Sequence, residues 1–167
     1  AALRGEFVLG PGEISLSVAS NKDTTLMVGA DASYALWLFD LKIEAALRHG
    51  DHGTWYKGTL DYENLEFPST VDRSEEWIPQ VVVGLELPIK YNEEDTLYVG
   101  AEYFHNEAGY ENSSLLPWMI YNGGYRPLYL GRDYAAAYLL LATPGRLDHT
   151  SFSLSGLGNL SDSSYQT

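Results

Sequence analysis

Apolar and polar residues alternate one by one over most of this chain. From Leu26 to Ala35 the even positions carry Leu, Val, Ala, Ala and Tyr, and the odd positions are mostly small or polar. From Phe39 to Arg48 the alternation resumes with the odd positions apolar. Because successive side chains of a β-strand point to opposite faces, each segment predicts a strand with one apolar face. The change of phase predicts a tight turn between two antiparallel strands.

The same pattern recurs along the chain and predicts about eight strands. They are expected at residues 2–9, 13–20, 24–35, 39–48, 78–87, 95–105, 133–143 and 149–158. Residues 42–48 and 133–142 also have good helix propensity, with Gly50 as a potential C-cap, so a helix remains an alternative there. Alternation in the neighbouring segments favours strands. No stretch approaches the roughly 18 apolar residues of a membrane-spanning helix.

The connections between these strands fall into two classes. Short links are expected at 10–12, 36–38, 88–94 and 144–148, and long links at 49–77 and 106–132. Both long links fall on the same side of the predicted sheet, together with the short link 21–23. Long loops on one side and short turns on the other are typical of outer-membrane barrels. The sequence therefore predicts an all-β fold, an antiparallel up-and-down transmembrane β-barrel, with residues 1–167 as one domain.

The side on which the first and last predicted strands begin and end indicates whether the chain forms a whole barrel. The first predicted strand begins on the long-loop side and the last one ends there, whereas single-chain bacterial barrels start and end on the opposite side. We therefore expect the chain to be an internal part of a larger barrel that lacks at least one strand at each end. The intact barrel would then have at least about ten strands.

Four segments strengthen this interpretation through resemblance to a known class. They are residues 11–17, 100–106 with Gly109 and Tyr110, 130–134 and 158–162. With them the chain resembles the transmembrane β-barrels of Gram-negative outer membranes, and more narrowly the large porin-like barrels. The resemblance implies a bacterial outer-membrane location, a passive or structural role, and contact with membrane lipid and lipopolysaccharide. It supplies no catalytic residues and no cofactor.

The polar positions of the predicted strands would line the lumen of such a barrel. They are Asp31, Asp40, Lys42, Glu44, Arg48, Gln80, Glu86 and Glu102. Five acids against two bases would favour cations in a water-filled pore. Alternatively, the charges pair into a plug or form a hydrated wall, and Asp31 is expected near Lys42 or Arg48.

Aromatic residues gather at one predicted turn. Tyr34, Trp37 and Phe39 surround the link 36–38, and rings of this kind sit at membrane–water boundaries. Tyr103 is assigned to the same interfacial class. The apolar string from Leu115 to Tyr121 is unusual for a solvent-exposed loop, and folding over the chain's own strands is its plainest explanation. Inward folding as a constriction and packing on another subunit remain alternatives.

Composition excludes several other functions. The chain carries 10 Lys+Arg against 23 Asp+Glu, a net charge of −13, which argues against nucleic-acid binding. It has no Cys, which excludes disulfides and thiolate metal sites. The acids of 49–77 are read as solvated loop, although divalent cations are an alternative. The pairs His49 with His52 and His149 with Ser151 are too sparse to indicate a metal site or an enzyme.

Three functional hypotheses follow. The first is a porin-like passive channel for small hydrophilic solutes or ions. The second is a non-conducting outer-membrane barrel that anchors a partner protein, other subunits or a surface polymer through residues 49–77 and 106–132. The third is a soluble β-barrel that binds an apolar ligand inside.

Overall fold

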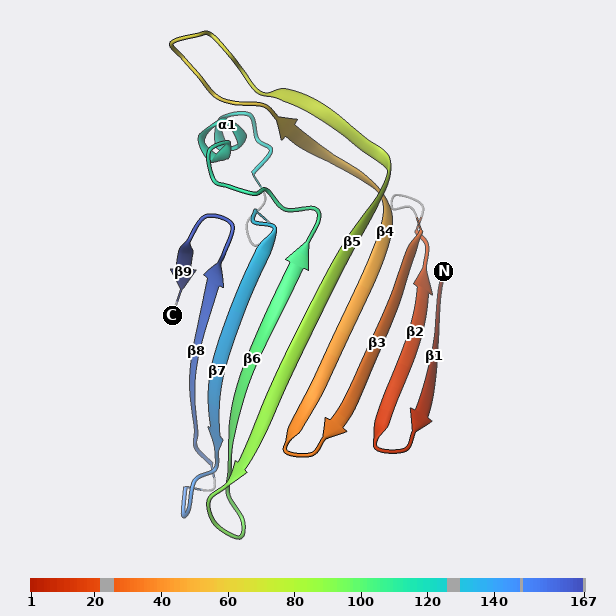
Figure 1. Cartoon of the computed structure of the whole chain (residues 1–167), viewed down its shortest axis with the longest axis vertical. Helices are drawn as coiled ribbons and strands as arrows, with labels where there is room; N and C mark the ends of the chain where they lie inside the picture. The colour runs from red at the N-terminus through yellow and green to blue at the C-terminus, as the bar shows by residue number, and fades with distance from the viewer. Residues whose placement is uncertain (22–25, 126–129, 148, 167) are drawn as a thin grey trace.

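The alternating segments form one antiparallel sheet. In the computed structural model of this chain, residues 1–21, 26–125, 130–147 and 149–166 are described, and over them the sheet has nine strands. Each strand pairs with its neighbours in the sequence, so the sheet is a meander (Figure 1). The strands are β1 Ala2–Leu9, β2 Gly12–Ala19, β3 Met27–Leu36, β4 Phe39–Lys57, β5 Ser69–Lys90, β6 Thr96–Asn106, β7 Asp133–Ala142, β8 Ser151–Asn159 and β9 Ser164–Gln166. The predicted all-β, up-and-down arrangement is confirmed.

The two segments with high helix propensity are strands. Residues 42–48 lie inside β4, and residues 133–142 form the whole of β7. β4 pairs with β3 and β5, and β7 pairs with β6 and β8, so both have neighbours on either side. Pairing on both sides satisfies their backbone groups and outweighs the modest helix propensity. The strand expected at 24–35 is described only from Leu26 onward, because residues 24 and 25 lie outside the described ranges.

The loop expected at 49–77 is largely strand, which corrects the prediction. β4 and β5 continue past the sheet as a two-stranded hairpin that projects beyond the other strands (Figure 1). The pairing shifts register between His49 and Asp51 and again between Asp51 and Trp55. Gly50 lies at the first shift with φ 82° and ends no helix. Such bulges interrupt the two-residue alternation, which is why the pattern predicts a strand end there.

The link between β6 and β7 folds onto this hairpin. It contains a short helix, α1 Leu116–Tyr121, whose Met119 is 1% exposed and packs with Tyr56 and Leu115. A second cluster joins Trp55, Ile78 and Ala108. Leu115, Leu116, Trp118 and Met119 of the apolar string therefore pack against the chain's own hairpin, as expected, whereas Ile120 and Tyr121 are exposed.

Gly109 marks the closest approach in this link, and a side chain there has no room. A Cβ atom on Gly109 would lie 1.9 Å from the carbonyl oxygen of Gly131. We expect Gly109→Ala to destabilise the folded link by about 1–3 kcal/mol, because backbone atoms must move apart. Limited proteolysis should show faster cleavage within residues 107–125. Gly158→Ala is the matched control, because its Cβ would meet neighbours only at 3.8 Å or more; equal cleavage of both variants would contradict the prediction.

The sheet is open at both edges. β9 was not among the predicted strands; it pairs through three residues with the end of β8. Over the described residues, β1 pairs only with β2, and β9 only with β8. The structure thus shows an open antiparallel sheet, with exposed backbone donors and acceptors along each edge.

Candidate functional site

All eight residues predicted to line a lumen lie on one face of the sheet. Residues directly opposite each other in an antiparallel pair share a face. Glu44 lies opposite Asp31, and Asp40 lies opposite Glu86. The same register places further polar residues there that the sequence analysis does not single out. This face, called the polar face, carries Arg4, Glu6, Glu13, Ser15, Asp31, Ser33, Asp40, Lys42, Glu44, Arg48, Gln80, Glu86, Glu102 and Asn106.

The partner expected for Asp31 is wrong. Asp31 lies opposite another acid, Glu44, and its Oδ1 accepts a hydrogen bond from Arg4 Nη2 at 3.3 Å. Ser15, which lies between them on β2, donates to the same oxygen at 2.9 Å and accepts from Arg4 at 3.0 Å. The cation that balances Asp31 thus comes from β1 and not from Lys42. Extending the alternation of β1 back to Arg4 would have placed this residue on the polar face.

A second polar chain crosses the middle of the face. Lys42 Nζ lies 3.9 Å from Glu86 Oε1, and Tyr138 Oη donates to Glu86 Oε2 at 2.6 Å. The Tyr138 ring lies over Gly100, where an added Cβ would be 2.1 Å from the ring. The small residue on β6 therefore makes room for the aromatic ring on β7. Sequence reasoning missed Tyr138, because the run from Ala135 to Ala142 is apolar at nearly every position and shows no alternation that would assign it to a face.

The opposite face is apolar and exposed. Most of its large side chains are more than a third exposed, and Leu16, Leu154 and Leu3 reach 54%, 66% and 73%. Monomeric soluble proteins rarely leave an apolar patch of this extent open to water. This face, called the apolar face, presents Leu3, Phe7, Leu9, Ile14, Leu16, Val18, Val28, Tyr34, Ile43, Leu47, Val83, Leu85, Ile89, Tyr103, Leu139, Phe152 and Leu154.

The predicted interface aromatics lie toward the two ends of the sheet. Tyr34, Trp37 and Phe39 surround the turn between β3 and β4, and Trp37 is 90% exposed. That turn lies at the end opposite to the projecting hairpin (Figure 1). Tyr103 lies near the hairpin end, three residues before the end of β6. The aromatics therefore flank the apolar face along the strand direction.

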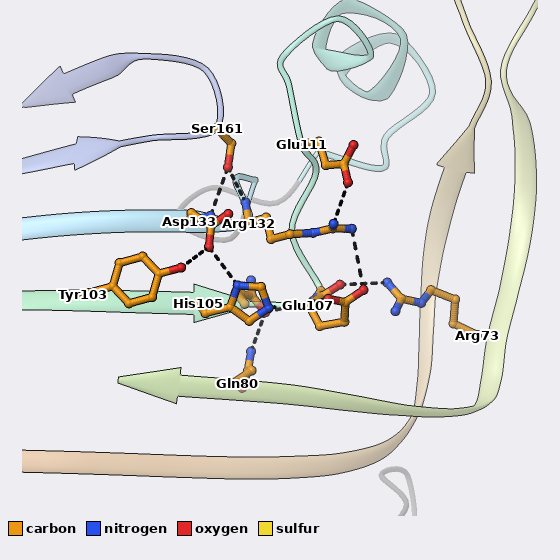
Figure 2. A network of polar contacts seen from close by, with 11 residues as sticks. Arg73, Gln80, Tyr103, His105, Glu107, Glu111, Arg132, Asp133 and Ser161 are labelled. Atoms are coloured by element: carbon orange, nitrogen blue, oxygen red, sulfur yellow. Dashed lines mark hydrogen bonds and ion pairs between the residues drawn. The ribbon is translucent and has the colours of Figure 1, made fainter. Parts of the chain in front are cut away.

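A polar network closes the end of β6 and β7, as Figure 2 shows. The Oδ1 atom of Asp133 accepts from Tyr103 Oη at 2.5 Å and lies 2.8 Å from Nδ1 of His105. Ser161 Oγ accepts the backbone N–H groups of Arg132 and Asp133, both at 3.0 Å. These contacts fix the start of β7 against the end of β6 and the turn after β8.

Arg132 continues this network into the β6–β7 link. Its guanidinium lies 3.6 Å from Glu107 and 2.6 Å from Glu111, and Arg73 donates to the carbonyl oxygen of Glu107 at 3.2 Å (Figure 2). The second ring nitrogen of His105 lies 3.5 Å from Glu107. The His105 ring thus lies between two carboxylates, those of Asp133 and Glu107. These contacts hold both ends of the β6–β7 link in place, which supports a structural role for the network.

The acids at the tip of the hairpin build a turn. The carboxylate of Asp61 accepts the backbone N–H groups of Glu63 and Asn64 and the side-chain amide of Asn64. The Asn64 side chain contributes most to holding the pKa of Asp61 below its usual value, followed by the two backbone N–H groups. Among the described residues, no cluster of three His, Asp or Glu side chains is arranged to hold a metal ion.

A cavity of about 310 Å³ lies where the β6–β7 link covers the hairpin end of the polar face. Arg48, Gln80 and Asn106 line it from the polar face. Residues of the link and of the hairpin complete the lining, namely Thr54, Trp55, Ala108, Tyr110, Met119, Gly124 and Leu130. The link therefore lies over the polar side of the sheet.

Asn106 organises the sheet side of this cavity. It is fully buried, and its Oδ1 accepts from Gln80 Nε2 at 2.8 Å and from the backbone N–H of Ala108 at 3.1 Å. Arg48 is held by Asp51 through an Nη2–Oδ2 contact of 2.9 Å. Sequence reasoning places Arg48 and Gln80 on this face but misses Asn106, which is the last residue of β6.

Two findings concern the helix content and the similarity to known proteins. Over the described ranges, no helix is long and apolar enough to cross a membrane. Comparison of the chain with models of protein families, with curated proteins and with solved structures gives no match. The structural features that bear on function are the two opposed faces of the sheet and the cavity at one end of the polar face.

Proposed function

We propose that this chain is part of a transmembrane β-barrel of a bacterial outer membrane that passes small hydrophilic solutes or ions. The apolar face would contact lipid and lipopolysaccharide, and the polar face would line the lumen. The observation that carries this proposal is the exposure of large apolar side chains from β1 to β8 on one face of the sheet. Strands β1 to β3 and β6 to β8 have 8 to 11 residues, close to the 9–11 residues that cross a bilayer.

The open edges support closure into a barrel. A strand edge inside a bilayer would leave backbone groups without hydrogen bonds, each at a cost of several kcal/mol. β1 and β9 would therefore pair with further strands of the intact barrel. The position of the β6–β7 link supports the same orientation, because it lies on the polar side and would narrow the lumen. In a soluble barrel that binds an apolar ligand, the apolar face would instead be inside.

The second candidate is a non-conducting barrel that anchors a partner. The observation that favours it is a set of exposed apolar side chains at the hairpin end, including Tyr62 at 69%, Leu65 at 74% and Tyr121 at 87%. Such residues support contact with another protein or a surface polymer. Extraction separates both candidates from the soluble barrel, since only a membrane barrel requires detergent to remain in solution.

Conductance separates the channel from the anchor. In planar bilayers, we expect the full-length protein to give discrete single-channel steps with a reversal potential that indicates cation preference, because acids outnumber bases on the polar face. The double variant Asp31→Asn and Glu44→Gln should move that potential toward zero. The variant Glu75→Gln, an exposed residue of the hairpin, serves as control. Flat current traces at high protein load would leave the anchor as the function.

A further inference from the structure

Two nitrogen atoms in residues that line the cavity have no hydrogen-bond partner among the described residues. They are Nε of Arg48 and Nδ2 of Asn106, and both are shielded from bulk water. The Oδ1 atom of Asn106 already accepts two N–H groups, so its amide is oriented with Nδ2 as the free donor. Buried donors are nearly always satisfied by protein, ordered water or a ligand. A hydrogen-bond acceptor bound in the cavity would satisfy these two donors.

The charge of the wall indicates which acceptor fits. Arg48 is the charged residue among the described residues that line the cavity. The carboxylate of Asp51, which pairs with Arg48, does not belong to that lining, and its oxygens accept from Arg48, Gly53 and Trp55. A carboxylate forms stronger hydrogen bonds with a guanidinium than a neutral oxygen does.

The remaining wall is mostly apolar, with Thr54 and Gln80 as its other polar residues besides the Tyr110 hydroxyl, and it favours a ligand with a compact apolar body over a sugar. It includes Trp55, Met119 and Leu130, and a cavity of about 310 Å³ is at the small end of ligand sites. A sugar would need a free aromatic face on which to stack. The Trp55 ring is stacked on Tyr110 with centroids 4.9 Å apart and lies 4.6 Å from the Arg73 guanidinium, so both contacts compete with a sugar for the ring.

We propose that this cavity binds a small organic anion, a carboxylate carried on a compact apolar body. The carboxylate would accept from Arg48 and Asn106, and the body would lie among Trp55, Met119 and Leu130. This is a property of the site that goes beyond passive conduction. It holds for a conducting and for a non-conducting barrel, so its failure and that of the channel proposal are distinguishable.

The test is calorimetric titration of the full-length protein in detergent micelles with sodium benzoate. We expect saturable binding at one site per chain. Benzyl alcohol, which has a similar body without the charge, should bind at least tenfold more weakly to the same unmodified protein. Because this comparison needs no substitution, it does not depend on the folding of a variant.

Two variants locate the site. Arg48→Gln removes the cation, and Asn106→Asp keeps Oδ1 while placing a second carboxylate oxygen at the position of Nδ2. Each should weaken benzoate binding by about ten- to a hundredfold. The matched control Arg4→Gln removes the same charge from the same polar face outside the cavity, and should leave the affinity unchanged. Circular dichroism verifies that each variant retains its β-structure.

Three results would overturn the proposal. The first is an absence of saturable benzoate binding to the unmodified protein. The second is equal affinity in Arg48→Gln, Asn106→Asp and Arg4→Gln when all three are folded. The third is tighter binding of benzyl alcohol or of methyl glucoside than of benzoate, which would assign the cavity to neutral ligands.

Discussion

The Ile43→Arg substitution is expected to lower the free energy of unfolding in a lipid bilayer by about 2–4 kcal/mol. Ile43 lies in the middle of the apolar face, opposite Ala32 on β3 and Val83 on β5. A guanidinium at this depth would have to leave water for hydrocarbon or draw water into the bilayer. Urea titration of the protein folded in phospholipid vesicles, followed by tryptophan fluorescence, measures the change.

The next residue provides the matched control. Glu44 lies on the polar face opposite Asp31, so Glu44→Arg places the same side chain beside an acid. We expect this variant to stay within about 0.5 kcal/mol of the unmodified protein, as surface substitutions usually do. If Glu44→Arg were the destabilising variant and Ile43→Arg were neutral, the two faces would be assigned the wrong way round.

The Asp51→Ala substitution is expected to destabilise the hairpin end of the protein by about 3 kcal/mol. Asp51 is 6% exposed and accepts from Arg48 at 2.9 Å, from Trp55 Nε1 at 3.1 Å and from the backbone N–H of Gly53 at 2.8 Å. Its removal leaves a partly buried guanidinium, the buried Trp55 Nε1–H and the part-buried Gly53 N–H without their acceptor, which costs far more than the loss of a surface contact. Hydrogen exchange of the Trp55 and Tyr56 amides reports this change locally.

Glu75→Ala is the control for Asp51→Ala. Glu75 lies on the same hairpin but is exposed, so its removal should leave amide protection unchanged. Equal protection in the two variants would mean that Asp51 does not hold the double register shift of β4 in place.

The sequence predicts the sheet wherever its alternation is uninterrupted. β1 to β3, β6 and β7 agree with their predicted bounds to within a few residues. Alternation alone also places the predicted polar residues together on one face of the sheet. The prediction fails near Gly50, where the pairing of β4 with β5 shifts register twice and the regular alternation is interrupted. β9 was missed because three residues are too few to show a period.

The site is less accessible from the sequence, because its contacts depend on how distant strands are aligned. The ion pair of Arg4 with Asp31 joins β1 and β3 across Ser15 of β2, and no local pattern encodes that register. The cavity depends on how the link from β6 to β7 packs against Trp55 and Asn106. Sequence could mark the link as unusually apolar, but it could not indicate what the link covers.

Neighbour-only pairing of the strands also has a kinetic consequence. Over the described residues, each pairing joins consecutive strands, so no strand has to find its partner beyond the next strand along the chain. Assembly can then proceed by adding one hairpin at a time, with a small entropy loss at each addition. The β6–β7 pairing is the exception because residues 107–132 must first be closed into a loop, and the contacts of Arg132 with Glu107 and Glu111 join the two ends of that loop. Closure of this loop is therefore expected to set the rate at which the C-terminal strands join the sheet.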